Sequence, residues 1–569
     1  MTLTRRDMLI LSGAASLAGL SGCGADSSDA ALATAMGADT DDRGPASVPP
    51  PPRVSFRHGV ASGDPLSDRV ILWTRVTPAD DTALRIPVTV QVARDPSMQQ
   101  LVTVIETYAL ASNDFCVKVD AAGLLPDHWY YYRFRVGGQM SPVGRTRTFP
   151  AMGSAKDRAR FAVVSCSNYA YGLFSVYRAL ANATDLDFIL HLGDYVYEYG
   201  AGEYGDFPGR EPQPPHEMVT LSDYRQRHAQ YKTDTALQAL HQQVPFVVTW
   251  DDHESANDSY RDGAENHDPL TEGDWQQRQG AARQAYAEWM PIRDDMVVAG
   301  EIYRAMHFGD LIDLLMLDTR LEGRDQQVTN PADPARNSAD RQLISPAQMG
   351  WLQDRLAASQ SRWRFLGQQV MFAQLNIAEI PGIEDDPELR GNLVAINMDQ
   401  WDGYAADRQA LLNFLADNDI RDTVILTGDI HTSWANEIYR NPATLLGDLF
   451  DEPLAAEFVT PAVTSPGFPE GAAEAASLAI PLANPHIRYT ELKSRGFILM
   501  DVTRERAQAE FYYVRTIESL DLMGQLDDSK TKVVAVRHGS SRIVEDTPRS
   551  SARTVQSAMR SPKPREVMA

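Results

Sequence analysis

Four short segments place acidic, histidine, cysteine and tyrosine side chains directly after apolar runs. They are residues 165–168 (SCSN), 192–198 (LGDYVYE), 249–257 (TWDDHESAN) and 427–434 (TGDIHTSW). Several ionisable groups in succession behind a buried strand gain nothing from packing, so the third segment in particular favours a metal-binding or catalytic role. Together the segments predict one polar site built at strand ends.

Individual residues in these segments have chemistry suited to metal binding. Asp194 follows Gly193, where the backbone can approach an ion, and a carboxylate can bridge two metals. Tyr197 is a hard ligand that suits ferric iron, although surface packing would also explain it. Cys166 alone is a weak signal, because free cysteine is commonly a small buried hydrophobe. Asp429 and His431 are two residues apart, so in an extended segment both side chains can point into the same pocket.

The elements that must position these groups form an alternating pattern. Apolar strand-like runs each stop at a polar cluster, and helical segments such as 408–417 lie between them. The runs are residues 161–164, 188–190, 246–248, 311–317 and 424–426. This order predicts an α/β layered catalytic domain over residues 158–533, with its chemistry at the strand ends.

Residues 53–150 have a different pattern, in which strand-like runs alternate with turn signals and no helical period is evident. The best strands are residues 70–76, 88–92 and 130–136. The Leu-Pro pair at 125–126, just before the tyrosines, resembles the corner of a fibronectin-type module. We therefore expect a small fibronectin-like β-sandwich, with its aromatic side chains in the core.

Length and charge limit the classes of function. The chain has 569 residues, so a large catalytic domain with a smaller module is expected. Its formal net charge of −24 would repel nucleic acid at long range, which excludes nucleic acid as a main partner. A small phosphorylated substrate is also an anion, and bound metal ions are the obvious source of local positive charge. Cysteines occur only at positions 23, 116 and 166, so no disulfide framework is expected.

The N-terminus carries a targeting pattern. Arg5 and Arg6 form a twin-arginine motif, and the apolar stretch from 9 to 20 is too short for a confident membrane span. Residues 1–23 therefore read as a Tat signal peptide, which implies the Tat export machinery as a partner and a location in the periplasm or at the cell envelope. The end of this stretch resembles a lipobox, so Cys23 is either a lipid anchor or merely close to an ordinary cleavage site.

Two further segments have compositions typical of disorder. Residues 24–52 are rich in Ala, Asp, Ser and Pro and predict a disordered tether. Residues 534–569 turn basic and Ser-rich and predict a disordered tail.

In order along the chain, the four segments resemble the motifs of the calcineurin-like metallophosphoesterases. The departures point to one branch: Cys166 stands where most relatives carry an aspartate, DDHE at 251–254 replaces Gly-Asn-His-Glu, and GDIH at 428–431 replaces Gly-His-x-His. Together with WDGY at 401–404 and HGVASGDP at 58–65, these motifs resemble the PhoD-like family. The resemblance extends over about residues 54–515.

This resemblance implies a metal-dependent phosphoesterase that carries one ferric iron and one or two calcium ions. Asp194 would bridge the metals. The implied ligands are Cys166, Tyr197 and His431 for iron, and Asp252, Asn257 and Asp429 for calcium. His253 would stabilise or protonate the departing oxygen, while a metal-bound oxygen attacks phosphorus in line.

Several points stay open in the sequence. Arg320 could clamp a phosphate oxygen, or it could form an ion pair with Asp318 at a strand end. No histidine stands at 368–371, so the ligand count of the second metal is undefined. The natural substrate, and the preference for monoesters or diesters, is also undefined. We expect a monomer.

Two alternative functions share part of this pattern. A purple acid phosphatase shares a β-module, the Gly-Asp-x-x-Tyr spacing and a ferric tyrosinate, but it should show Gly-Asn-His and Gly-His-x-His, and neither is present. If the chain were a non-catalytic surface lipoprotein, the occurrence of acids and histidines at four strand ends would be a coincidence.

Overall fold

The computed structural model describes residues 52–80, 84–294, 297, 300–329, 333–375, 398–440, 451–469, 471–545 and 547–553. The chain divides into two compact units, Met1–Pro50 and Pro51–Ala569, and the first lies outside the described residues. The predicted signal peptide and nearly all of the predicted tether lie there too. Within the described part of the chain, no helix has the length and apolar character that crossing a membrane requires.

A mixed ten-stranded sheet has the order β24-β23-β22-β21-β11-β12-β13-β2-β3-β7. Its centre is parallel: β11 (Arg158–Val164), β12 (Phe188–His191), β13 (Phe246–Val248) and β2 (Val60–Gly63). Antiparallel strands extend both sides. They are β21 (Gly496–Thr503), β22 (Arg506–Tyr513), β23 (Lys532–Arg537) and β24 (Ile543–Glu545) on one side, and β3 (Arg69–Arg75) and β7 (Cys116–Ala122) on the other.

A seven-stranded sheet has the order β14-β15-β16-β17-β19-β18-β20. The four strands β15, β16, β17 and β19 run parallel. The bounds are β14 (Arg304–Phe308), β15 (Ile312–Met316), β16 (Trp363–Gln368), β17 (Thr423–Thr427), β18 (Ser433–Ile438), β19 (Ala455–Val459) and β20 (Ile487–Glu491).

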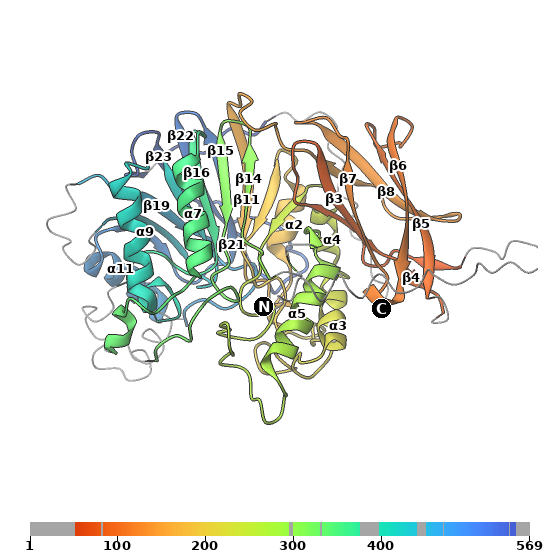
Figure 1. Cartoon of the computed structure of the whole chain (residues 1–569), viewed down its shortest axis with the longest axis horizontal. Coiled ribbons are helices and arrows are strands. Elements are labelled where there is room, and N and C mark those ends of the chain that lie inside the picture. Colours follow the sequence, from red (N-terminus) through yellow and green to blue (C-terminus); the bar gives the residue numbers. More distant parts are fainter. Residues whose placement is uncertain are drawn as a thin grey trace, which may run out of the picture. The chain divides into compact units, whose positions relative to one another are not determined.

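The two sheets share one apolar core, and helices cover their other faces (Figure 1). In the shared core, the rings of Phe161 on β11 and Phe365 on β16 lie 5.9 Å apart. Strands buried on both faces explain the continuous apolar runs in the sequence. On the ten-stranded sheet lie α2 (Ser175–Asn182), α3 (Leu221–Tyr231), α4 (Thr235–His241) and α5 (Trp275–Trp289); on the seven-stranded sheet lie α7 (Pro346–Ala358), α9 (Ala405–Asp417) and α11 (Ala472–Ala483). The prediction that the catalytic domain combines strands and helices as an α/β domain is confirmed.

The remaining short elements connect these layers. The 3-10 helices are η1 (Ala111–Asn113), η2 (Tyr169–Tyr171), η3 (Pro334–Asn337) and η4 (Trp401–Tyr404). Two short strands, β1 (Val54–Ser55) and β4 (Thr77–Pro78), pair with each other.

The N-terminal region is rich in strands, as predicted. A third sheet has the order β10-β8-β5-β6, with β9 paired to β8. It consists of β5 (Arg85–Ala93), β6 (Leu101–Leu110), β8 (Trp129–Val136), β9 (Gln139–Met140) and β10 (Gly144–Arg147). Its inner face packs against β2, β3 and β7, and the backbone N–H of Leu125 donates to the hydroxyl of Tyr130 at 2.8 Å. That bond is the geometry of a tyrosine corner, at the position where the sequence predicts a corner.

The N-terminal sandwich, predicted to end near residue 150, is not a separate unit in the structure. Its second sheet is part of the large sheet: Gly63 of β2 is in register with Phe246 of β13. The Trp73 indole also donates to the carbonyl oxygen of Glu288, at 2.8 Å, at the end of α5. The sequence did not reveal this because β2 is only four residues of small side chains, VASG, and a hydrophobic pattern does not specify which edge a strand joins.

The predicted disordered tail is also wrong in part. Residues 534–545 contribute to β23 and β24, and Val534 and Val536 are buried in the core between the two large sheets. Lys532 and Glu545 form an ion pair across this hairpin at 3.0 Å. The basic, Ser-rich composition concealed a short alternating strand. Residues 554–569 lie outside the described residues.

This shared sheet generates a prediction about truncation. A chain that begins at residue 153 should fail to fold, because it lacks β2, β3 and β7 and leaves Trp289 without its Trp73 neighbour, 5.7 Å away. A chain that begins at residue 52 is the control and should unfold cooperatively. Circular dichroism melts and limited proteolysis distinguish the two. Cooperative unfolding of the 153–569 chain near the temperature of the control would show that the sandwich is detachable.

Candidate active site

The four predicted segments meet at one edge of the two large sheets. Cys166 follows β11, Asp194 follows β12, Asp252 follows β13 and Asp429 follows β17. These strands all run parallel within their sheets, so their carboxyl ends lie at the same edge. The N–H of Cys166 donates to the carbonyl of Gly193 at 3.2 Å, which ties the first two segments together.

The backbone at this edge adopts unusual angles. Cys166, Asp194, Asp429 and His431 have φ of 61°, 55°, 64° and 61°, in the left-handed region that residues other than glycine seldom adopt. Such conformations cluster at functional sites. Gly193, with φ of 105°, has a further constraint: a Cβ here would lie 2.4 Å from the Cβ of Asp251. Glycine at 193 therefore lets the ends of β12 and β13 approach closely.

The first possible metal-binding group consists of Cys166, Asp194 and His431, whose ligand atoms lie within 4.8 Å of one another. Tyr197 joins it, because its hydroxyl lies 2.9 Å from Asp194 Oδ2 and 3.3 Å from His431 Nε2. His431 Nδ1 lies 2.9 Å from the carbonyl oxygen of Pro466, which can only accept. Nδ1 therefore carries the proton and Nε2 presents its lone pair to the group, as in metal-binding histidines.

Two further groups are continuous with the first. One consists of Asp194, Asp252 and His253, and the other of Asp251, Asp252 and Asp429. Asp194 and Asp252 are thus shared, and the three groups form one chain of ligand atoms. Asp194 Oδ1 is buried and has no hydrogen-bond partner among the described residues. A buried carboxylate oxygen without a partner is costly, and a cation is the natural way to satisfy it.

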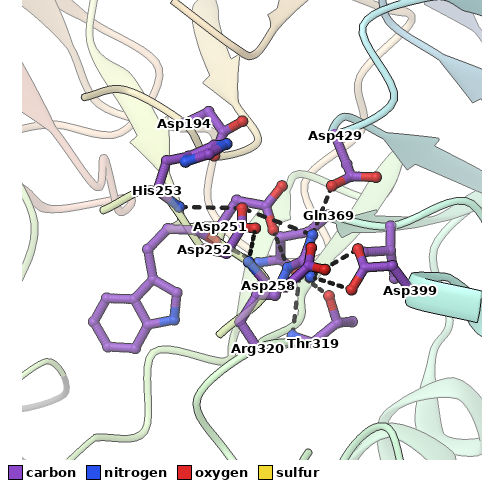
Figure 2. Close-up of polar contacts among 12 residues, drawn as sticks. Asp194, Asp251, Asp252, His253, Asp258, Thr319, Arg320, Gln369, Asp399 and Asp429 are labelled. Atoms are coloured by element: carbon purple, nitrogen blue, oxygen red, sulfur yellow. Dashed lines mark hydrogen bonds and ion pairs between the residues drawn. The ribbon is translucent and has the colours of Figure 1, made fainter. Parts of the chain in front are cut away.

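Arg320 lies at the centre of the acidic cluster and is fully buried (0% exposed). Its guanidinium donates to Asp251, to both oxygens of Asp399 at 2.8 Å, and to Asp429 at 2.6 Å (Figure 2). With every guanidinium nitrogen already engaged, this geometry does not favour Arg320 as a phosphate clamp. The geometry agrees with the alternative that Arg320 forms ion pairs, but its partners are Asp251, Asp399 and Asp429.

Asp318 does not form an ion pair with Arg320. Its carboxylate accepts from the backbone N–H groups of Arg320 and Leu321, both at 2.9 Å, and so shapes the loop after β15. Gln369, within the stretch 368–371 that lacks a histidine, connects the same strand ends. Its amide nitrogen donates to the carbonyls of Trp250 and Leu317. Its amide oxygen accepts from Thr319 (Figure 2).

His253 is held by a buried carboxylate. Its Nδ1 lies 2.7 Å from Glu198 Oε2, and Glu198 has no exposed surface. Burial acts to lower the pKa of His253, but the charges of Glu198, Asp252 and Asp194 outweigh it and raise this pKa well above its ordinary value. His253 therefore carries a proton. Its Nδ1 is engaged by Glu198, so Nε2 is the ring atom that can contact a ligand.

Asn257 is the predicted ligand that the structure does not bring to the cluster. Its side-chain amide donates to Glu265 at 3.1 Å, and its backbone N–H donates to Glu198 at 2.7 Å. The neighbouring Asp258 contacts the cluster directly, because its backbone N–H donates to Asp252 Oδ2 at 2.6 Å. Burial, together with Asp399 and Asp252, raises the pKa of Asp258 to about 7.

The thiol of Cys166 and the phenol of Tyr197 are protonated in this environment. Burial raises the pKa of each well above its ordinary value, and the charge of Asp194 adds to the effect. Binding of a cation would have to release both protons, which makes any metal affinity of this group dependent on pH.

Several residues of the site were not singled out from the sequence. Glu254 accepts from the backbone N–H groups of Asp194, Tyr195 and Asp251 and so joins the loops after β12 and β13. It was visible in the third segment, but only as part of a charge cluster. Asp399, by contrast, comes from a stretch without a readable pattern, and no local signal could have found it.

Comparison with known proteins identifies the family. The model for the PhoD-like phosphatase family matches residues 161–511, and the model for the N-terminal domain of PhoD-like phosphatases matches residues 43–150. The chain belongs to the PhoD-like phosphatase family. It is 38% identical to alkaline phosphatase D of Bacillus subtilis (strain 168) over 471 residues, which cover 80% of this chain and 77% of that protein. A solved structure of PhoD matches with a TM-score of 0.77 and 34% identity, covering 88% of this chain and 94% of that one.

Glu254 generates a prediction about pH. Burial raises the pKa of Glu254 to about 8, and the charge of Asp194 adds to this, whereas an unfolded chain titrates near ~4.3. Between these values the folded protein holds a proton that the unfolded chain has released. The free energy of unfolding of chelator-treated protein should therefore fall as pH rises from about 5 to 8, by on the order of a few kcal/mol.

Urea unfolding at several pH values in chelator measures this slope. Glu254→Gln should flatten it, although the raised pKa of Asp258 acts in the same direction and will leave part of it. Adding metal ions should also flatten it, because cations favour ionised carboxylates. Stability that stays constant or rises between pH 5 and 8 in chelator would contradict the assignment.

Proposed function

We propose that the protein is a metal-dependent phosphoesterase that hydrolyses phosphate monoesters, diesters or both. Family membership supports a phosphoesterase. The metal dependence is supported by three adjoining groups of possible metal ligands, which are connected because they share Asp194 and Asp252.

The donor set fits the iron and calcium that the sequence resemblance implies. Around Cys166 the donors are a thiol, a phenol, an imidazole nitrogen and a carboxylate, a set suited to ferric iron. Around Asp252 the donors are carboxylate oxygens, the set that calcium prefers. Cys166, Tyr197, His431 and Asp194 would hold iron, while Asp194, Asp252 and Asp429 would hold calcium. Asp258 is a better placed candidate than Asn257 for a further oxygen ligand.

The bound metals would neutralise the phosphate charge and activate the nucleophile. The side chains would do the rest. Glu198 orients His253 and keeps it charged, so that Nε2 can deliver a proton to the departing oxygen. Arg320 is assigned a positioning role, because its four acidic neighbours include two proposed ligands, Asp252 and Asp429.

The layering supports the metallophosphoesterase architecture that the sequence resemblance implies. Two sheets pack face to face, and helices cover both outer faces. A purple acid phosphatase would share the tyrosine ligand. However, Asp251 and Asp429 stand where that alternative requires Gly and His, and both lie inside the cluster.

Export by the Tat pathway remains a proposal that rests on Arg5 and Arg6 and the apolar stretch after them. Replacing both arginines by lysine should leave folded protein in the cytoplasm, and unchanged export would refute the proposal. Fractionation of a Cys23→Ala variant separately tests lipid anchoring.

The test of the proposed function measures activity on two classes of ester, in wild type and in a His253→Asn variant. Metal-loaded wild type should hydrolyse at least one of a matched pair, propyl phosphate and the propyl ester of methylphosphonic acid, which mimics a diester. Loss of the proton donor in His253→Asn should lower kcat by roughly 10²- to 10⁴-fold on these alkyl esters. The loss should shrink on nitrophenyl esters, whose leaving group departs as a stable anion. Metal content should remain at the wild-type level.

Three outcomes count against this account. Wild type that is inactive on every ester although loaded with metal would refute the function. Metal loss in step with activity in His253→Asn would make His253 a ligand. Equal losses on propyl and nitrophenyl esters, with metal intact, would show that His253 binds phosphate without donating a proton.

A further inference from the structure

Two tyrosine rings, Tyr199 and Tyr204, lie beside His253, a third, Tyr171, follows Tyr204, and none of the three has a role in the proposed chemistry. The rings of Tyr199 and Tyr204 lie 5.5 Å and 6.3 Å from the His253 ring, and 5.3 Å from each other. Tyr171 follows, with its ring 6.5 Å from Tyr204. The buried ring of Tyr197 stacks on His253 at 4.2 Å, whereas the residues Tyr171, Tyr199 and Tyr204 are only partly buried. They form a continuous aromatic wall that leads away from the reaction centre.

An arginine lies at the outer end of this wall. The guanidinium carbon of Arg495 lies 5.6 Å from the centre of the Tyr171 ring. Its Nε and Nη1 donate to the backbone carbonyls of Thr464 and Lys493. Within the described residues, no carboxylate lies within ion-pair distance of Arg495. The charges of Glu491 and Glu518 act on Arg495 from beyond ion-pair distance. In a chain of net charge −24, an arginine held by backbone carbonyls and in no direct ion pair can bind an external anion.

The wall is held rigidly against the catalytic segments. The Asn168 amide, two residues after Cys166, donates to the carbonyl of Tyr204 at 2.7 Å. Phe207 donates from its backbone to Ala170 at 2.9 Å. Gly205, with φ of 123°, allows this approach, because a Cβ there would lie 2.6 Å from the carbonyl oxygen of Ala170. A ring held on a fixed loop loses little conformational entropy when it binds a ligand.

We propose that Tyr199, Tyr204 and Tyr171, with Arg495 at the outer end, form a subsite for the leaving portion of the phosphoester. It selects an alcohol that carries a ring and, beyond the ring, a second anionic group. Aromatic faces bind flat ring surfaces, and a guanidinium binds a carboxylate or phosphate. The placement on the leaving-group side rests on the proposed function, since it follows from His253 as the proton donor.

The test compares three leaving alcohols of similar acidity. Benzyl, 4-carboxybenzyl and propyl phosphate are measured, each also as the ester of methylphosphonic acid. In wild type, kcat/KM should rise from propyl to benzyl to 4-carboxybenzyl. Tyr204→Ala should lower kcat/KM for the benzyl ester about 3- to 10-fold, as expected for loss of one aromatic contact, and leave the propyl ester unchanged. Arg495→Gln should abolish only the preference for the carboxylate.

Matched controls separate recognition from structure. Tyr204→Phe keeps the ring and should behave as wild type, and Tyr108→Ala removes a half-exposed tyrosine from the N-terminal sheet. If Tyr204→Ala does not fold, Tyr199→Ala makes the same test. Equal losses on propyl and benzyl esters, or no loss on either, would overturn the subsite. If wild type hydrolyses no ester, the proposed function fails. Calorimetric titration with benzylphosphonate against propylphosphonate then decides the subsite alone: tighter benzyl binding supports it, and equal binding overturns it.

Discussion

The concentration of buried carboxylates around Asp194 and Arg320 is the constraint on which the rest of the site depends. Asp194, Asp251, Asp252 and Asp399 are buried and Asp429 is half-buried, and the cationic groups beside them include Arg320, Arg324 and His253. Charges buried together at this density are unstable unless cations compensate them. Arg320 compensates the side that includes Asp251 and Asp399. The unpartnered oxygen of Asp194 lies on the other side, where Cys166, Tyr197 and His431 converge.

The two-sheet core places this charge at one edge. Parallel strands from both sheets end there, and the turns after β11, β12 and β17 each contribute one or two polar residues in left-handed conformations. Left-handed backbone conformations at aspartate, cysteine and histidine reduce stability. The rigid apolar core beneath the turns offsets this loss. Glu254 adds a second restraint, because its carboxylate holds the backbone after β12 and β13 in place. The aromatic wall extends the same edge outward from His253.

The residues that could be predicted from the sequence are those whose positions follow from a local pattern. Cys166, Asp194, Asp252 and Asp429 each come directly after an apolar strand, so their convergence followed from the parallel order alone. The partners of Arg320 could not be predicted in this way, because Asp399 lies in a stretch without periodicity. The pairing of β2 with β13 and the strands within residues 534–545 were missed for a related reason. Short strands of small or mixed residues carry too little hydrophobic pattern to reveal their neighbours.

The central claim is that Asp194 belongs to both proposed metal-binding groups. The metal content of an Asp194→Asn variant tests this claim most directly. Purified wild type should contain iron and calcium in stoichiometric amounts. Asp194→Asn should lose both metals together, because one carboxylate serves both groups, while circular dichroism shows that it remains folded. Asp310→Asn, at an ion pair with Arg504 outside the cluster, is the matched control and should keep both. Retention of both metals in folded Asp194→Asn, or fully active wild type that contains zinc alone, would contradict the account.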